Sequence, residues 1–164
     1  MDMEHGSIEK QIHIEASPQA VYEVISSPEH IARWWFDEAD FEPTPGSIGV
    51  LAASAETGRL EVPIAVVDAR PGARFSFRWV APPAPAIVPE GAALTTQNSV
   101  LITFELTPDG DGTLLSVTEE GMRELGWEAA LLEDYCNGHG RVWARLLAGL
   151  PGYVASLGAP GAPR

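Results

Sequence analysis

The C-terminal part of the chain constrains the fold most, because apolar residues recur there with the spacing of an amphipathic helix. The residues with this spacing are Leu131, Leu132, Tyr135, Cys136, Val142, Trp143, Leu146, Leu147, Leu150, Val154 and Leu157. A helix over residues 135–150 would be roughly 24 Å long, which is enough to cross a whole sheet. Pro151 predicts a kink rather than a stop, since the apolar pattern resumes beyond it.

Two glycines, Gly138 and Gly140, fall inside this predicted helix. Each costs roughly 1 kcal/mol relative to alanine in a helix interior. Two interpretations stay open: the glycines let the helix backbone approach the sheet or a bound molecule, or the first turn of the helix is frayed. The single cysteine, Cys136, allows no internal disulfide and lies on the apolar face, so we expect a buried, inert thiol.

Length and charge limit the classes of protein to consider. The 164 residues predict one domain spanning residues 1–164, with a core over about residues 8–157 and mobile termini. The net charge of -13 repels phosphate backbones and anionic lipid, so we expect neither nucleic-acid nor membrane binding. No uncharged run is typical of a membrane span, and residues 1–7 have no apolar signal region. We therefore expect a cytoplasmic protein.

The remaining segments predict a curved antiparallel sheet with helices on one side. Residues 8–15 alternate as a half-buried strand. Ser17-Pro18 and Ser27-Pro28 each place a capping residue before a proline, which predicts two short helices. Further strands are predicted over residues 48–53, 59–69, 73–80, 99–107 and 113–120. The fold class is α+β, a sheet of about six strands wrapped on the long C-terminal helix.

Three local features qualify this arrangement. Pro63 lies inside a predicted strand, so we expect that strand to be at an edge or bulged there. Residues 108–112 are a clear hairpin turn between two strands. Residues 81–98 contain four prolines and little periodicity, so they are predicted to form a long loop, a flap near one end of the sheet.

The chain resembles a known superfamily through five segments in a fixed order. They are residues 16–22 (ASPQAVY), 30–35 (HIARWW), 75–79 (FSFRW), 112–122 (GTLLSVTEEGM) and 143–150 (WARLLAGL). This order resembles the SRPBCC, or START-like, helix-grip superfamily of the birch-pollen allergen type. Within it, the chain is similar to the AHSA-type branch, which is homologous to the C-terminal domain of the activator of heat-shock-protein ATPase.

The resemblance implies a sheet that grips the long helix and leaves an apolar cavity between them. Such cavities usually hold small hydrophobic or amphipathic molecules, and bacterial members of this branch mostly lack an assigned reaction. The eukaryotic activator, which belongs to the stress response, carries a separate N-terminal domain that contacts the chaperone. This chain has no room for one, so a chaperone-associated interaction module is the weakest of the alternatives.

Aromatic residues dominate the predicted inner surface. Of Trp34 and Trp35, we expect at least one in the core, and the other is either core or a pocket wall. The residues predicted to line a ligand pocket are Trp35, Phe41, Val50, Ile64, Phe75, Phe77, Trp79, Ile102, Phe104, Val117, Trp143 and Leu147. Most are apolar, as a pocket for a lipophilic ligand requires.

Three polar residues are predicted among these apolar ones: Glu119, Tyr135 and His139. His139 lies four residues after Tyr135, so both share a helix face, and Glu119 shares a strand face with Val117. If they converge, a carboxylate and an imidazole can share a proton or anchor a ligand. The alternative is that Glu119 lies at an exposed strand end and His139 is a satisfied polar group.

Two hypotheses of different classes follow. The favoured one is a non-catalytic binding protein for a small apolar ligand, without a cofactor. A homodimer is one option for its assembly. The other hypothesis is a cyclase, dehydratase or hydrolase that uses Glu119, Tyr135 and His139 as acid–base groups. The four histidines are scattered, and none pairs with another ligand at metal-binding spacing, so no metal site is expected.

Overall fold

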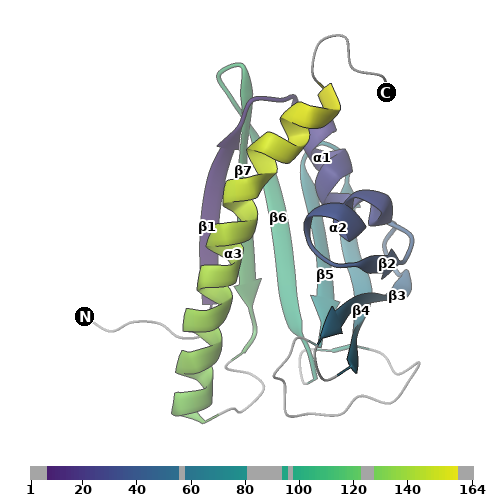
Figure 1. Cartoon of the computed structure of the whole chain (residues 1–164), viewed down its shortest axis with the longest axis vertical. Helices are drawn as coiled ribbons and strands as arrows, with labels where there is room; N and C mark the ends of the chain where they lie inside the picture. Colours follow the sequence, from purple (N-terminus) through teal and green to yellow (C-terminus); the bar gives the residue numbers. More distant parts are fainter. Residues whose placement is uncertain (1–6, 56–57, 81–93, 96–97, 123–127, 159–164) are drawn as a thin grey trace.

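The computed structural model describes residues 7–55, 58–80, 94–95, 98–122 and 128–158. In chain order the elements are β1 (Ser7–Ile14), α1 (Pro18–Ser26), α2 (Pro28–Trp34), β2 (Glu38–Asp40), β3 (Ile48–Ala55), β4 (Gly58–Arg70), β5 (Arg74–Trp79), β6 (Val100–Asp109), β7 (Gly112–Glu120) and α3 (Ala129–Gly158). The predicted α+β helix-grip fold is confirmed (Figure 1). Most of the predicted flap over residues 81–98, Trp127 and both termini fall outside the described residues.

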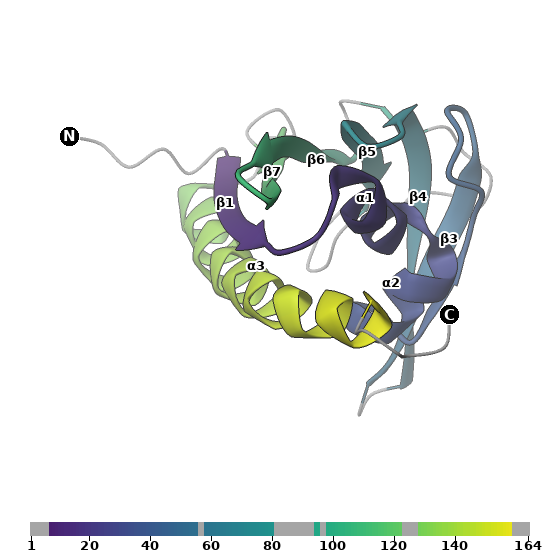
Figure 2. The same ribbon diagram turned by 90° about the horizontal axis from the view of Figure 1, so that it is seen from above.

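The sheet has seven antiparallel strands in the order β1-β7-β6-β5-β4-β3-β2. It curves around the helices, and α3 runs beside β1 along the concave side (Figure 2). The sequence predicted about six strands and missed β2. This strand has only three residues, two of them acidic, so it shows no alternation that a sequence pattern could reveal.

The first two helices begin where the Ser-Pro pairs predict, but only one serine acts as a cap. Ser17 Oγ accepts a hydrogen bond from the Ala20 N–H at 3.1 Å, which satisfies a donor of the first turn of α1. Ser27 Oγ instead donates to Glu29 Oε1 at 2.6 Å, and its side chain makes no capping bond to α2. Pro28 still suits the first turn, since its missing N–H would have no helical partner there.

The long C-terminal helix is confirmed, but it begins earlier than predicted, at Ala129, and continues through Pro151. The frayed-turn interpretation of its glycines is wrong, and neither glycine is needed for a close approach of the helix to the sheet. A Cβ on Gly138 would meet nothing within 4 Å, and one on Gly140 would lie an ordinary 3.8 Å from Lys10 Cε. Both glycines also lie well inside the helix, not in its first turn.

Contrary to the prediction, Pro63 lies neither in an edge strand of the sheet nor at the bulge. It lies where the pairing between β4 and β5 stops. Its strand, β4, lies between β3 and β5, and the register shift occurs between Val66 and Asp68. The Pro63 carbonyl accepts from the Val80 N–H at 3.3 Å, just beyond Ile64 and Trp79, the last pair that β4 forms with β5. The missing N–H of Pro63 therefore faces the place where β5 has ended, and it costs the sheet no internal ladder bond.

The concave face carries the core, and its side chains follow the predicted alternation. Phe75, Phe77 and Trp79 are at most 4% exposed, and they face the buried residues of β4 and β6. The predicted hairpin is also confirmed: Asp109 pairs with Gly112 across a two-residue turn. Gly110 adopts φ +63° in this turn, a conformation that glycine takes without a steric cost.

Val50 is the exception among the predicted pocket residues. It pairs with Pro63, one residue out of phase with Ile64, which faces the core. Since side chains alternate along a strand, Val50 lies on the outer face, and Leu51, paired with Val62, is the inward residue of β3. The prediction for Val50 is wrong because residues 48–53 form a continuous run of small and apolar residues, which hides the phase.

Candidate functional site

Glu119 lies on the concave face near the end of β7, the second strand from one edge of the sheet. Its side chain is 0% exposed, although it is a carboxylate that would be strongly hydrated in water. It lies opposite Ile8 of β1 and Ile102 of β6, so apolar strand residues flank it on both sides. A buried carboxylate is stable only when hydrogen bonds replace its lost hydration.

Three neutral donors from two other elements supply these bonds. Trp143 Nε1 on α3 donates to Oε1 at 2.9 Å, and Trp79 Nε1 on β5 donates to Oε2 at 3.2 Å. The Tyr135 hydroxyl on α3 also donates to Oε2. Both carboxylate oxygens therefore hold α3 against the middle of the sheet. We call Glu119, Trp79, Tyr135, Trp143 and His139 the Glu119 cluster.

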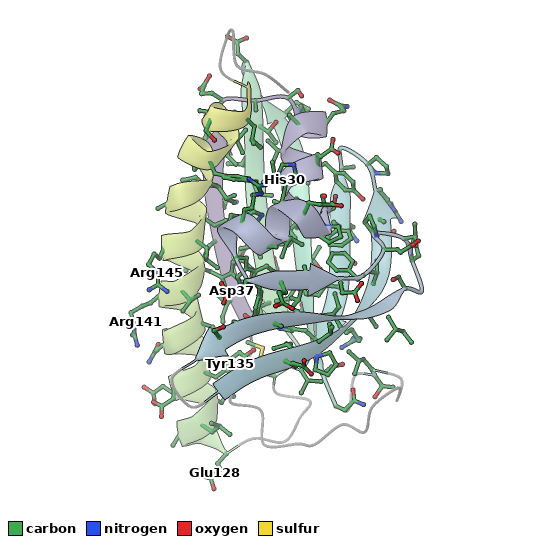
Figure 3. All side chains as sticks on the ribbon, turned by 45° about the vertical axis from the view of Figure 1, so that its right-hand side comes forward. His30, Asp37, Glu128, Tyr135, Arg141 and Arg145 are labelled. Carbon is green, nitrogen blue, oxygen red and sulfur yellow. The ribbon has the colours of Figure 1, made fainter. Side chains whose placement is uncertain are left out.

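His139 is the member of the cluster that reaches the surface. Its Nδ1 lies 3.4 Å from Glu119 Oε1, and its side chain is 19% exposed. One turn earlier on α3, the Tyr135 ring stacks on the imidazole, with centroids 3.9 Å apart and planes 11° apart. Figure 3 marks Tyr135 on the N-terminal half of α3. The structure thus brings together the three polar residues that the sequence singled out.

The electrostatics of the cluster favour a fixed arrangement. Burial raises the pKa of the Tyr135 hydroxyl far above its ordinary value, and the negative charge of Glu119 raises it further. Tyr135 therefore remains a neutral hydrogen-bond donor at any physiological pH. Within the cluster, only the His139 side chain is more than 4% exposed, so it is the member that solvent reaches.

An aromatic wall adjoins the cluster; we use this name for Trp35, Phe36, Phe77, Trp79 and Trp143. The Trp35 ring, just after α2, lies 4.9 Å from Trp143, 5.3 Å from Trp79, 6.0 Å from Phe77 and 5.1 Å from Phe36 between centroids. Phe77, Trp79 and Trp143 are buried, whereas Trp35 and Phe36 are partly exposed. The wall therefore has a rigid inner layer and an outer layer in contact with solvent.

The Trp34 ring stacks on that of Trp35, with centroids 5.5 Å apart, but its other contacts are with α1 and the core. Its Nε1 donates to the Val24 carbonyl at 2.9 Å, and its ring contacts Phe104 edge-on at 6.4 Å. Trp34 thus ties α2 to α1 and to the core, although it remains partly exposed. Of the two neighbouring tryptophans, Trp35 is the one that matches a pocket wall.

Most predicted pocket residues are packed against one another. Those at most 4% exposed are Ile64, Phe75, Phe77, Trp79, Ile102, Phe104, Val117, Trp143 and Leu147. Two open clefts of about 580 and 560 Å³ lie elsewhere, on the α1–α2 side of the molecule. Phe41, 8% exposed, lines both of them. A guest between sheet and helix would therefore have to displace side chains, and Trp35 and Phe36 are the most accessible.

Comparison of the sequence with models of known families shows the family of this chain. The model of the family described as "Activator of Hsp90 ATPase homolog 1-like protein" matches residues 15–155, which is most of the chain. The chain belongs to this family. The AHSA-type resemblance of the sequence is thereby confirmed. Among proteins with curated descriptions, none matches the chain.

Solved structures show the same fold at low identity. A Rhodobacter sphaeroides protein has a TM-score of 0.70 at 19% identity. The match covers 96% of this chain and 97% of the Rhodobacter chain. The Mll3558 protein of Rhizobium loti has a TM-score of 0.63 at 25% identity, covering 89% and 94%. The Aha1 dimer of Colwellia psychrerythraea, solved in solution, has a TM-score of 0.66 at 18% identity, covering 95% and 98%.

Two more observations bear on the class of this AHSA1-family chain. Within the described residues, no helix combines the length and apolarity that crossing a bilayer requires. The same part of the chain contains no group of three or more His, Cys, Asp or Glu side chains placed to hold a metal ion.

The sequence missed the role of two tryptophans in this AHSA1-family site. Trp79 and Trp143 were predicted as apolar lining, yet their indole N–H groups hold Glu119. A signal was present, because a buried indole N–H usually finds an acceptor and Glu119 was the one carboxylate predicted among the inward residues. Phe36 was also missed, since it follows the predicted helix and has no periodic pattern to place it.

Proposed function

We propose that this AHSA1-family protein binds a small hydrophobic or amphipathic molecule between the curved sheet and α3. The observation that carries the proposal is the aromatic wall, with Trp35 and Phe36 partly exposed over buried Trp79 and Trp143. Exposed aromatic rings beside an apolar interior are what a small-molecule site provides. The ligand would insert between the outer and inner layers of this wall.

The Glu119 cluster supports this proposal by fixing the inner layer. Each of the two indole N–H groups donates to one oxygen of Glu119, which sets the orientation of its ring. A preorganised surface loses little conformational entropy on binding, so more of the contact energy appears as affinity. Trp35, by contrast, follows the last residue of α2 and is partly exposed, so it is the ring that a ligand would reach first.

A ligand screen on the intact protein tests this proposal. Small apolar and amphipathic molecules should raise the melting temperature in a concentration-dependent way, because they bind the folded state. The same molecules should change tryptophan fluorescence. Trp35→Ala should weaken binding by at least tenfold, whereas Tyr153→Ala, which removes a partly buried ring near the other end of α3, should not. Equal affinity in the two variants contradicts the proposed site.

A second candidate, an acid–base enzyme, is favoured by one observation: Glu119, Tyr135 and His139 are in contact. Since Glu119 is fully buried and Tyr135 stays protonated, His139, which solvent reaches, would have to carry the proton. For any substrate that is turned over, His139→Gln should abolish turnover and leave binding intact. Turnover retained in His139→Gln rules out this mechanism, and binding without turnover across a substrate panel favours the binding protein.

Two further points belong to the proposal. The similar protein from Colwellia psychrerythraea is a dimer, and we propose that this chain forms a homodimer as well.

We also propose a cytoplasmic location. The one cysteine of this chain, Cys136, forms no disulfide, which fits the reducing cytoplasm. Cell fractionation tests the location, and sedimentation tests the oligomeric state.

A further inference from the structure

The outer face of β3 and β4 carries an uncharged apolar strip. Ile48 pairs with Ala65 and Val50 pairs with Pro63, and these four side chains lie on the face opposite to Ile64. Ile48 is 61% exposed, and Val67, beside the register shift of β4, is 49% exposed. They are the two exposed large hydrophobic residues in the described part of the chain. We call Ile48, Val50, Pro63, Ala65 and Val67 the outer strip.

The rest of the outer face is mostly polar, although Leu101 and Leu114 are partly exposed there, so the strip is its most exposed apolar area among the described residues. Arg74 and Glu105 form an ion pair across β5 and β6, and Thr103 faces Thr118 across β6 and β7. Figure 2 shows the three helices on the concave side of the sheet and none over β3 and β4 on the other side. A contiguous apolar area with a polar surround is typical of an interaction surface.

The structure assigns the outer strip as the surface through which two copies of this chain associate. This inference rests on the homodimer proposed above and names its interface. A two-fold contact places the same strip on both sides, so apolar residues meet apolar residues without a separate partner sequence. A stable interface covers roughly 800 Å² per partner, so the strip would be its centre and the neighbouring polar residues its rim.

Charge explains why the strip, rather than a sheet edge, would be used. The edge strand β2 has only three residues, and its Glu38 and Asp40 are exposed, so a second copy paired there would bring carboxylates together. The other edge strand, β1, has α3 packed beside it. Because each copy carries a net charge of -13, the uncharged strip is where two copies can approach with the least repulsion.

The net charge also fixes the sign of the salt dependence. Two molecules of like charge repel, and salt screens this repulsion, so the dimer should become tighter as ionic strength rises. A cationic protein partner on the same surface would show the opposite trend, since salt would weaken its attraction to this chain. Sedimentation velocity across a range of protein and salt concentrations measures the effect.

Three single substitutions on the outer face complete the test. Ile48→Glu and Val67→Glu should each raise the dimer dissociation constant at least tenfold, or about 1.4 kcal/mol. Thr107→Glu, an exposed position on β6 with the same change in charge, is the matched control and should change it little. Circular dichroism and thermal melts confirm that each variant is folded.

The possible outcomes separate this inference from the homodimer itself. A dimer that the two strip variants weaken and the control does not supports the interface. A dimer that none of the three weakens, or all three weaken equally, keeps the homodimer and overturns the outer strip as its interface. A protein that sediments as a monomer at every concentration and salt overturns both.

Discussion

Two clusters that each contain a histidine–carboxylate contact lie at opposite ends of β7 and differ in burial. In the Glu119 cluster, a fully buried carboxylate accepts from two indoles and a phenol, with His139 at its side. Near the β6–β7 turn, His13 Nδ1 lies 2.8 Å from Asp109 Oδ2, and His13 Nε2 lies 2.7 Å from Glu15 Oε2. The His13 side chain is 38% exposed.

The difference shows how burial changes the role of a histidine–carboxylate contact. Solvent screens the exposed contacts of His13, and water can replace any bond that is lost. No such replacement is available to Glu119, so every donor around it must come from the protein. We therefore expect the buried cluster to control folding stability and the exposed one to respond mainly to pH and salt.

Removing the buried carboxylate should have the largest effect. Glu119→Ala leaves the N–H groups of Trp79 and Trp143 and the hydroxyl of Tyr135 without an acceptor, and we expect a loss of about 3–5 kcal/mol in the free energy of unfolding. Urea denaturation measures it. Glu120→Ala, at the exposed neighbouring position, is the control and should cost no more than about 0.5 kcal/mol. Similar losses in the two variants would contradict the burial argument.

Removing a single donor should have an intermediate effect. Tyr135→Phe keeps the ring but deletes the hydroxyl, with an expected loss of about 1–3 kcal/mol at neutral pH. Burial, assisted by Glu119, raises the pKa of Tyr135, so the unfolded chain loses this proton first. Above about pH 10 the wild type should therefore lose stability with rising pH, and Tyr135→Phe should lose less. Parallel pH profiles for the two proteins would refute this link.

A gain of stability is expected beside the cluster. Gly138 lies inside α3, and a Cβ there would meet nothing within 4 Å. Gly138→Ala should therefore stabilise the protein by about 0.5–1 kcal/mol, because alanine loses less backbone entropy in a helix. If thermal melts show destabilisation, the glycine serves contacts that the present arrangement does not include.

The exposed cluster should give the smallest effect. Hydrogen bonds to Asp109, and then to Glu15, raise the pKa of His13 above its ordinary value. The stabilisation is therefore fully present below about pH 6.5 and is lost as pH rises through the folded-state pKa. His13→Gln should lower the melting temperature slightly near pH 5.5 but not near about pH 9, and about 1 M salt should reduce the difference. A pH-independent difference would exclude the charge effect.

Most of the fold could be predicted because its strands and last helix have regular patterns. Phe75, Phe77 and Trp79 alternate with polar residues, and the spacing of Tyr135, His139 and Trp143 fixes one face of the helix. The same two periodicities placed the polar residues on inward faces, but their convergence remained one of two alternatives. The burial of Glu119 was left open, since a sequence pattern gives the face of a strand residue but not what covers the strand end.

The predictions failed where the sequence shows no regular alternation of apolar residues, or where the role of a residue depends on neighbouring elements of the fold. The three residues of β2 are too few to alternate, and the uniform run of residues 48–53 concealed the phase of Val50. Pro63 was judged on its missing N–H alone, whereas the end of β5 beside it determines whether that donor is needed. Likewise, the indole donors of Glu119 become visible only when β5 and α3 are placed together.

The position of α3 after all seven strands of the sheet has a consequence for biosynthesis. Trp143, Leu147 and Leu150 of this last element complete the core, and the first strand, β1, pairs with the last, β7. A ribosome-bound chain that lacks α3 would present the apolar lining of the sheet to other proteins until α3 has been translated. Such a nascent chain depends on rapid release, or on a holdase, to avoid aggregation.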